Sequence, residues 1–194
     1  YGIRTTVFLK GCPLKCIWCC NPEGQSYRPE LKYTRDHCDG CGRCVAACPK
    51  GAITMDGALA KIDRKVCDGC MACVDSCYTD ALEPFGKYMT AQEVFEIIKA
   101  DEMFYRNTNG GATIGGGEAS SFPDFMLELI DLCHEAGIHV NVDTCGYTTS
   151  PKALEVLKRA DMLLYDIKGI DPALHKQNTG VDNKIILDNL RLLS

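Results

Sequence analysis

Fourteen cysteines in a chain of 194 residues constrain the fold more than any other feature of the sequence. Eleven of them fall into three tight runs, in which neighbouring cysteines are separated by two or three residues. Disulfides are the usual role of so many cysteines in a secreted chain. Spacing this close instead suits ligands that converge on one metal centre. We therefore predict metal clusters, and thiolate clusters imply a reducing, oxygen-poor cytoplasm.

Charge and hydropathy exclude two classes of partner. The formal net charge is −5 and no long basic run is present, which disfavours binding to a nucleic acid. No stretch approaches the ~18 uninterrupted apolar residues of a membrane span. No signal peptide is recognisable, and because Tyr1 is not a natural start we expect the true N-terminus to lie upstream.

Outside the cysteine-rich middle of the chain, strand patterns alternate with helix patterns. The expected strands are Ile3–Lys10, Ala112–Gly115, Ile138–Val142 and Asp161–Ile167. The expected helices follow a capping box at Thr90, begin near Pro123 and Pro151, and close the chain from about Asn183. Strands that alternate with helices imply βαβ units and a parallel sheet.

This alternation predicts where a site would form. In parallel α/β folds, ligands bind at the carboxyl ends of the strands. The first cysteine run, the Gly-Gly-Glu sequence ending at Glu118, Asp143 and Asp166 each follow such an end. We therefore expect residues far apart in the sequence to meet on one rim.

The first cysteine run, Cys12-Pro-Leu-Lys-Cys16-Ile-Trp-Cys19, places three thiolates on one loop. Three ligands on a cubane leave one iron open, and an open position separates catalytic from structural metal sites. Cys20 is a poor fourth ligand because adjacent side chains diverge. A zinc knuckle or a fully ligated electron-transfer cluster are the alternatives for this run.

The run Cys-x3-Cys-aromatic-Cys after a strand resembles the signature of the radical S-adenosylmethionine (SAM) superfamily. The longer sequence Gly2–Pro13, followed by Asn21–Glu23, resembles that of the glycyl-radical-enzyme activating enzymes. The resemblance covers essentially the whole chain. It departs at Tyr1, where that family usually has proline, and at Cys20, where it usually has histidine.

The resemblance implies a function. Cys12, Cys16 and Cys19 would hold a [4Fe–4S] cluster whose open iron takes the amino and carboxylate groups of SAM. Reductive cleavage would give a 5′-deoxyadenosyl radical that abstracts hydrogen from a glycine of a partner glycyl radical enzyme, with a flavodoxin or ferredoxin as electron donor. A radical SAM enzyme acting on a small molecule and a multi-cluster electron-transfer protein are the alternatives.

The resemblance also implies the contacts to the cofactor. Glu118 would receive the ammonium group of SAM, Lys168 would pair with its carboxylate, and Trp18 would pack near the adenine. Otherwise Trp18 is a core aromatic residue. The expected cofactor-binding residues are Trp18, Cys20, Gly116, Gly117, Glu118, Asp143, Asp166, Ile167, Lys168 and Gly169.

Two carboxylates on one rim suit a hard cation. By resemblance to the pyruvate formate-lyase activator, a monovalent cation would bind Asp143, Thr144, Asp166 and the carbonyl of Leu164. Helix capping is the alternative role for each aspartate. Among the remaining candidates, we expect His134 and His175 at the surface, and Cys133 and Cys145 as buried thiols.

The middle of the chain contains an internal repeat with the spacing Cys-x2-Cys-x2-Cys-x3-Cys, which predicts two similar halves. This is the pattern of bacterial two-cluster ferredoxins, in which the fourth cysteine of each run binds the other cluster. The expected ligand sets are Cys38, Cys41, Cys44 and Cys77 for one cluster, and Cys48, Cys67, Cys70 and Cys73 for the other. Such clusters would carry electrons; a docking platform or a zinc ribbon is the alternative.

Together these patterns predict an α/β fold, a partial (β/α)6-type TIM barrel of the radical SAM class, formed by residues 1–30 and 84–194. A bacterial-ferredoxin-like α+β insert would occupy residues 31–83. Four strand–helix units are visible, whereas the family resembled has about six. We therefore expect the barrel to be truncated at both ends, with about two units beyond Ser194.

Overall fold

The computed structural model describes residues 2–194, which form two compact units. The larger unit extends to Tyr27 and resumes at Met89–Ser194, and the smaller unit is Arg28–Tyr88. Each unit has its own hydrophobic core. The two are described separately below.

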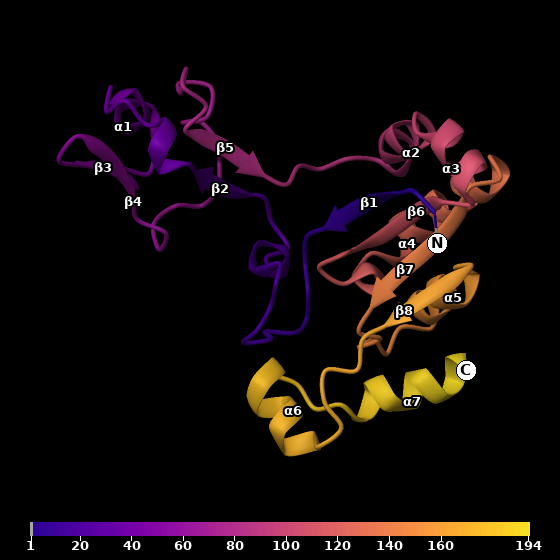
Figure 1. Cartoon of the computed structure of the whole chain (residues 1–194). Helices are drawn as coiled ribbons and strands as arrows, with labels where there is room; N and C mark the ends of the chain where they lie inside the picture. Colours follow the sequence, from indigo (N-terminus) through magenta and orange to yellow (C-terminus); the bar gives the residue numbers. More distant parts are fainter. Residues whose placement is uncertain (1) are drawn as a thin grey trace. The chain divides into compact units, whose positions relative to one another are not determined.

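The larger unit is built on a parallel sheet of four strands in the order β1-β6-β7-β8 (Figure 1). The strands are Arg4–Leu9 (β1), Gly111–Gly116 (β6), His139–Thr144 (β7) and Met162–Tyr165 (β8). Every neighbouring pair is parallel. The prediction of a parallel α/β sheet is thus confirmed, with each strand within a few residues of its expected bounds.

Six helices connect or follow the strands (Figure 1). They are Ala91–Lys99 (α2), Glu102–Thr108 (α3), Pro123–Glu135 (α4), Pro151–Arg159 (α5), Pro172–Thr179 (α6) and Lys184–Leu193 (α7). The sequence predicted four of these and missed α3 and α6. Helix α6 carries few apolar residues, so no helical periodicity marks it in the sequence.

The core of the larger unit lies on the helix-covered face of the sheet. Ile114, Val140 and Val142 from the strands pack against Ile98 of α2 and Leu129 of α4, and all are buried. Burying one large aliphatic side chain contributes about 1.5–3 kcal/mol. This packing fixes which face of each strand is turned away from the core.

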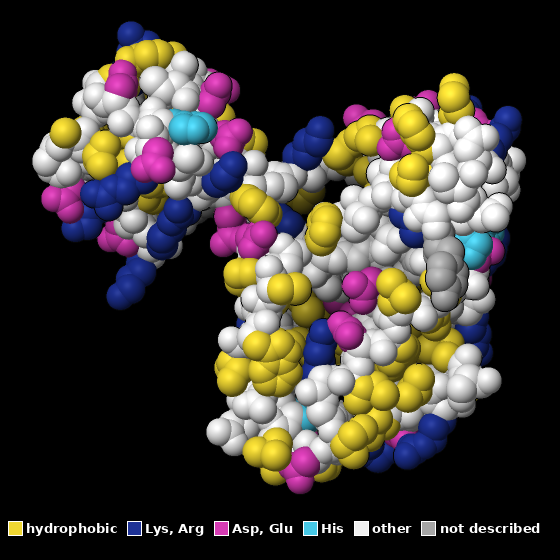
Figure 2. Space-filling view, viewed as in Figure 1, with side chains coloured by type: hydrophobic (Ala, Val, Ile, Leu, Met, Phe, Trp, Pro, Cys, Tyr) yellow, Lys and Arg dark blue, Asp and Glu magenta, His cyan; other side chains and the backbone are white. Residues whose placement is uncertain are grey.

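The opposite face of the sheet carries a different set of side chains. Successive residues of a strand alternate between faces, so Phe8 and Asp143 lie opposite the core. Phe8 pairs with Gly115 and Asp143 with Leu164, which places them in one row across the sheet. Phe8 is 68% exposed. In Figure 2, acidic and basic side chains of the larger unit lie beside one another among apolar ones.

The smaller unit consists of two antiparallel pairs of strands and a short helix. Strand Glu30–Tyr33 (β2) pairs with Leu82–Phe85 (β5), and Ile53–Asp56 (β3) pairs with Leu59–Ile62 (β4). The helix is Arg43–Ala47 (α1). Its core combines aliphatic side chains with cysteines of both repeat copies, namely Leu31, Ile53, Leu82, Cys44 and Cys73.

The two copies of the repeat share their turn geometry. The carboxylate of Asp39 accepts a hydrogen bond from the amide of Cys41, and that of Asp68 accepts one from Cys70, both at 3.1 Å. These Asx turns open each run in the same way. The second copy continues as turns where the first forms α1, so the similarity of the halves is partial.

Among residues 2–194, no helix is both long and apolar enough to cross a membrane.

The capping box at Thr90 is present as predicted. The Thr90 hydroxyl accepts from the amide of Glu93 at 3.2 Å, and the Glu93 carboxylate accepts from the amide of Thr90 at 2.8 Å. We expect Thr90→Ala to lower the free energy of unfolding by about 1 kcal/mol, because one amide of α2 loses its acceptor. Thr90→Ser keeps the acceptor and should unfold like the wild type. Chemical denaturation of the two variants would measure the difference.

Candidate metal and cofactor site

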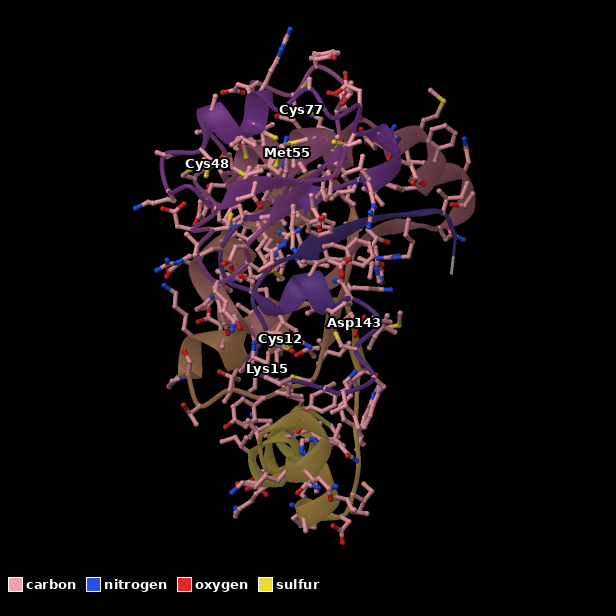
Figure 3. All side chains as sticks on the ribbon, turned by 90° about the vertical axis from the view of Figure 1, so that its left-hand side faces the viewer. Cys12, Lys15, Cys48, Met55, Cys77 and Asp143 are labelled. Carbon is pink, nitrogen blue, oxygen red and sulfur yellow. The ribbon has the colours of Figure 1, made fainter. Side chains whose placement is uncertain are left out.

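The first three predicted cluster ligands lie on the loop that follows β1, at the carboxyl end of the parallel sheet. A pocket of about 180 Å³ opens there. It is lined by the predicted residues Cys12, Cys16, Trp18, Cys19, Cys20, Gly116, Gly117, Glu118, Asp143, Thr144, Asp166 and Lys168. Figure 3 labels Cys12, Lys15 and Asp143 at this end of the unit. The structure thus brings most of the predicted site residues together, while Ile167 and Gly169 are outside the lining.

Four further residues line the pocket that sequence reasoning missed: Phe8, Leu14, Asn21 and Cys145. Phe8 has the same strand parity as Asp143, because the two sit in one row of the sheet. The alternation along Ile3–Lys10 could therefore have indicated it. Leu14 is 1% exposed, so it anchors the loop between two cysteines. Asn21 belongs to the Asn21–Glu23 sequence that carries part of the resemblance, and Cys145 directly follows Asp143 and Thr144, so both positions were marked although neither was predicted to line the pocket.

Backbone hydrogen bonds hold the base of the cysteine loop. The amide of Gly11 donates to Gly24 O at 2.7 Å, and the amides of Gly117 and Glu118 donate to Leu9 O and Gly11 O, both at 2.7 Å. A Cβ atom on Gly117 would lie 2.4 Å from Gly11 O and 2.9 Å from Gly24 O. Glycine is therefore required where these three backbone segments meet.

The carboxylate of Glu118 joins the ends of β6 and β7. It is 1% exposed. Its Oε1 accepts from the amide of Ser120 at 3.0 Å and from the hydroxyl of Thr144 at 2.6 Å, and its Oε2 accepts from the amide of Cys145 at 2.8 Å. A carboxylate offers about four acceptor positions. Three are used by these bonds, and the thiol of Cys145 also hydrogen-bonds to the carboxylate; burial and the charge and hydrogen bond of Glu118 raise the pKa of that thiol.

Asp143, Asp166 and Lys168 give the pocket opposing charges. Burial raises the pKa of Asp143, and the negative charge of Asp166 raises it further. Lys168 forms an ion pair with Asp166. Burial disfavours the ammonium form of Lys168, but the hydrogen bond and charge of Asp166 outweigh this and hold the pKa above its ordinary value. Lys168 therefore stays protonated, whereas ionisation of the Asp143 carboxyl group is disfavoured.

The loop cysteines are close enough to influence one another. Burial raises the pKa of Cys12, and the charges of Glu118, Cys16 and Cys19 add to the effect. Burial also raises the pKa of Cys16, although Lys168 opposes it. Burial and neighbouring charges thus favour the neutral thiols, so a positive charge in the pocket is needed to hold them as thiolates. A cluster iron would provide it.

No three Cys, His, Asp or Glu side chains within residues 2–194 converge on a single ion. A cubane takes each thiolate on a different iron, so its ligands need not converge on one point. The donor chemistry of the loop, three thiols around one pocket, therefore fits a cubane better than a mononuclear ion. The assignment of Cys12, Cys16 and Cys19 as its ligands stays a prediction.

The structure corrects two of the expectations for single residues. Trp18 is 49% exposed at the pocket, so the alternative role as a core aromatic residue is wrong. His175 is 2% exposed, so its expected place at the surface is also wrong; helix α6, which the sequence did not reveal, buries it. His134 is exposed, and Cys133 and Cys145 are buried, as predicted.

In the smaller unit, one of the two predicted ligand sets lines a common pocket. Cys48, Cys67, Cys70 and Cys73 surround it together with Leu31. The sulfur of Cys48 accepts from the amide of Ala52 at 3.3 Å. These four cysteines come from both copies of the repeat, as the exchange of the fourth cysteine requires. Figure 3 labels Cys48 and Cys77, which close the two runs.

In the other set, Cys38, Cys41 and Cys44 are neighbours, and Cys77 packs against the same hydrophobic core. Burial raises the pKa of Cys44, and the charges of Cys38 and Cys41 add to this. Burial acts on Cys77 in the same direction, but hydrogen bonds from Thr79 and from backbone amides outweigh it and lower its pKa. Donors directed at sulfur favour the thiolate, which is the form that binds iron.

Comparisons with known proteins agree with this arrangement. A family described as "Radical SAM superfamily" matches residues 66–194, and one described as "4Fe-4S dicluster domain" matches residues 37–81. The chain is 44% identical over 194 residues to a trans-4-hydroxy-L-proline dehydratase activating enzyme of Clostridioides difficile, covering 100% of this chain and 64% of that protein. It is 41% identical over 195 residues to a choline trimethylamine-lyase activating enzyme of Oleidesulfovibrio alaskensis, covering 99% and 63%.

The chain therefore spans less than two thirds of the length of these two curated relatives. Among solved structures, a domain of a pyruvate-formate lyase-activating enzyme from Bacteroides vulgatus is 30% identical. That match covers 43% of this chain and 52% of the other, with a TM-score of 0.39.

Gly117 provides a test of the loop base. We expect Gly117→Ala to lower the free energy of unfolding by about 1–3 kcal/mol, because the added methyl group meets two carbonyl oxygens that cannot move independently. Gly169→Ala is a matched control for stability, since its Cβ would meet nothing closer than 3.9 Å. Thermal unfolding would compare them. Equal midpoints would contradict the close approach at Gly117.

Asp143 should make the stability of the cluster-free protein depend on pH. Its pKa is raised above 3.8 in the folded state, so ionisation favours unfolding and stability is lost as the pH rises from 3.8 through the folded pKa. Asp143→Asn removes this loss, so its free energy of unfolding should increase relative to that of the wild type over the same pH interval. Denaturation at a series of pH values measures the gain. Parallel pH profiles of the two proteins would show that folding does not raise the pKa of Asp143.

Proposed function

This chain belongs to the radical SAM superfamily, and we propose that it carries the cluster- and cofactor-binding part of a glycyl-radical-enzyme activating enzyme. The observation that carries the proposal is the single pocket that collects the Cys-x3-Cys-x2-Cys loop, the Gly-Gly-Glu turn and the Asp166–Lys168 pair. A plain electron carrier needs only the cysteines. The similarity to two activating enzymes over nearly the whole chain supports the same function.

When bound, a [4Fe–4S] cluster supplies one electron for the cleavage of SAM to a 5′-deoxyadenosyl radical, which takes a hydrogen atom from a glycine of the partner enzyme. In our proposal Cys12, Cys16 and Cys19 hold this cluster. The loop leaves one iron without a protein thiolate, which allows the cofactor to bind there. The partner is a glycyl radical enzyme.

The polar residues of the pocket would bind and orient the cofactor. Glu118 is held in place by three N–H and O–H donors, and its carboxylate at the pocket would attract the ammonium group of SAM. Lys168 has three N–H donors and pairs with Asp166, so further N–H donors are available for the carboxylate of SAM. Trp18 offers an exposed ring to the adenine.

We also propose the cation site at Asp143, Thr144 and Asp166. The raised pKa of Asp143, caused by burial and by Asp166, is the property that a bound cation would relieve. A monovalent cation there would share with Lys168 the neutralisation of the Asp166 carboxylate. The hydroxyl of Thr144 donates to Glu118 and accepts from the amide of Gly146 at 2.9 Å, which leaves one lone pair for a cation.

The smaller unit would hold two further [4Fe–4S] clusters and deliver electrons. Cys38, Cys41, Cys44 and Cys77 form one proposed set, and Cys48, Cys67, Cys70 and Cys73 form the other. Fully ligated cubanes have no open iron, so electron transfer is the role that suits them. A flavodoxin or ferredoxin is the proposed donor. The compact unit Arg28–Tyr88 supports an insert near residues 31–83 within a partial barrel of residues 1–30 and 84–194.

Replacing the three loop cysteines tests the assignment of the catalytic cluster. The reconstituted protein should bind about twelve irons from three cubanes. In the variant Cys12→Ala, Cys16→Ala, Cys19→Ala, we expect the iron content to fall by about a third and SAM cleavage to disappear. Cys20→Ala, which alters the neighbouring residue, should keep the full iron content. Loss of cleavage with unchanged iron would place the catalytic cluster elsewhere.

A second pair of variants separates electron delivery from catalysis. With Cys41→Ala and Cys70→Ala combined, SAM cleavage driven by dithionite should persist in part, because this small reductant reaches the loop cluster directly. Glycyl radical formation driven by flavodoxin should fall more steeply. Electron paramagnetic resonance of the partner's radical measures the second activity. Equal losses in both assays, with the loop cluster intact, would argue against the role in electron delivery.

A further inference from the structure

Helix α6 holds the middle of the cysteine loop. The amide of Lys15 donates to Thr179 O at 2.7 Å, and the amide of Ile17 donates to Asn178 O at 3.0 Å. These two amides flank Cys16. The last carbonyls of a helix have no partner within the helix, so they are available to accept such bonds. The loop is therefore held at its base by β1 and β6 and at its middle by the end of α6.

Two buried side chains fix the last turn of α6. Thr179 is fully buried, and its hydroxyl lies 2.8 Å from His175 O and 3.1 Å from Val181 O. The Nδ1 atom of His175 lies 2.7 Å from Val181 O. A carbonyl oxygen only accepts, so Nδ1 carries the proton and donates to Val181. Together the two side chains hold Val181, which follows the C-cap residue Gly180, against the last turn of the helix.

The other ring nitrogen of His175 supports this assignment. Its Nε2 is buried and has no hydrogen-bond partner within residues 2–194. Burying a polar atom without a hydrogen-bond partner costs free energy of folding, so other contacts of His175 must offset the cost at Nε2. Nδ1 contacts Val181 O and also lies 3.1 Å from the hydroxyl of Thr179, and an apolar residue of similar size would make neither contact.

The same corner holds the segment that follows Lys168. The side-chain amide of Asn183 donates to Gly169 O at 3.0 Å and to Ile170 O at 2.7 Å. A Cβ atom on Gly169 would lie 3.9 Å from both Cβ and Cδ2 of His175. The α6–α7 corner thus contacts both the cysteine loop and the segment that follows Lys168.

We propose that His175 and Thr179 are positioning residues that fix the end of α6, so that its carbonyls set the orientation of Cys16 in the cluster-binding loop. The proposal rests on the proposed function for the meaning of the loop, but not for the contact itself. Neither residue lines the pocket. Their effect reaches the site through the amides of Lys15 and Ile17.

Hydrogen exchange in the full-length, reconstituted protein tests this contact. Tandem mass spectrometry at single-amide resolution would follow Lys15 and Ile17. Thr179→Val removes the hydroxyl with little change of shape, and we expect both amides to exchange about tenfold faster, the effect of losing a buried hydrogen bond. Thr179→Ser keeps the hydroxyl and should restore the wild-type rate.

A matched pair at His175 isolates the role of Nδ1. The side-chain amide of asparagine can take the place of Nδ1–H, whereas that of glutamine reaches toward the position of Nε2. We expect wild-type exchange at Lys15 and Ile17 in His175→Asn and about tenfold faster exchange in His175→Gln. His134→Gln, at an exposed position of α4, is the control for replacing a histidine.

Internal reference amides complete the design. Gly11 and Cys12 donate to Gly24 O and Gln25 O at the base of the loop and should keep their protection in every variant. A chelator should also remove iron from the first cluster sooner in Thr179→Val and His175→Gln. Unchanged exchange at Lys15 and Ile17 in these two variants would overturn the proposal. Absence of SAM cleavage in the wild type would instead refute the proposed function and leave the exchange result standing.

Should Thr179→Val unfold the larger unit, seen as lost protection in α4, the histidine pair decides alone. Equal exchange in His175→Asn and His175→Gln would then overturn the proposal. Faster exchange only in His175→Gln would support it.

Discussion

The close approach of three backbone segments at the carboxyl end of the sheet determines the rest of the site. Gly11, at the start of the cysteine loop, bonds to Gly24 in the turn Pro22–Gln25 and to Glu118 after β6. These bonds are possible because Gly117 has no side chain. They tie the cysteine loop to the Gly-Gly-Glu turn, so the thiols and the carboxylate enter one pocket in a fixed relation.

The chemistry of the pocket follows from the face of the sheet on which it lies. The helices cover one face with aliphatic side chains, and the other presents Phe8, Asp143 and their neighbours in the same row. Glu118 is buried there with three donors and is already oriented before any cofactor binds. Lys168 and Asp166 balance each other's charge. A preorganised set of this kind avoids much of the entropic cost of orienting a ligand.

The smaller unit has few residues with which to form a stable hydrophobic core. Its aliphatic core is slight, and cysteines such as Cys44 and Cys73 form part of it. Below roughly 70–80 residues a single hydrophobic core contributes little stability, and small natural domains often add a structural metal or disulfides. Bound clusters would therefore stabilise the unit as well as carry electrons, because ligands that bind only the folded state shift the equilibrium toward it.

Many elements and site residues of this protein were predictable from its sequence because the patterns that mark them are local. Cysteine spacing indicated cluster ligands, the period of apolar residues gave the parallel strands, and the Thr90–Glu93 pair marked the start of α2. Strand ends in a parallel fold also predicted which residues would share a rim, and twelve of the predicted site residues do line one pocket.

Only the tertiary structure decided the contacts between distant segments. Helix α6 lacks an apolar period, so no pattern in the sequence predicts that His175 is buried or that Thr179 O lies 2.7 Å from the amide nitrogen of Lys15. The exposure of Trp18 and the place of Leu14 in the pocket likewise depend on how the loop is held. Residue type and spacing specify local structure, whereas these positions follow from hydrogen bonds across more than 150 residues of chain, which no local pattern encodes.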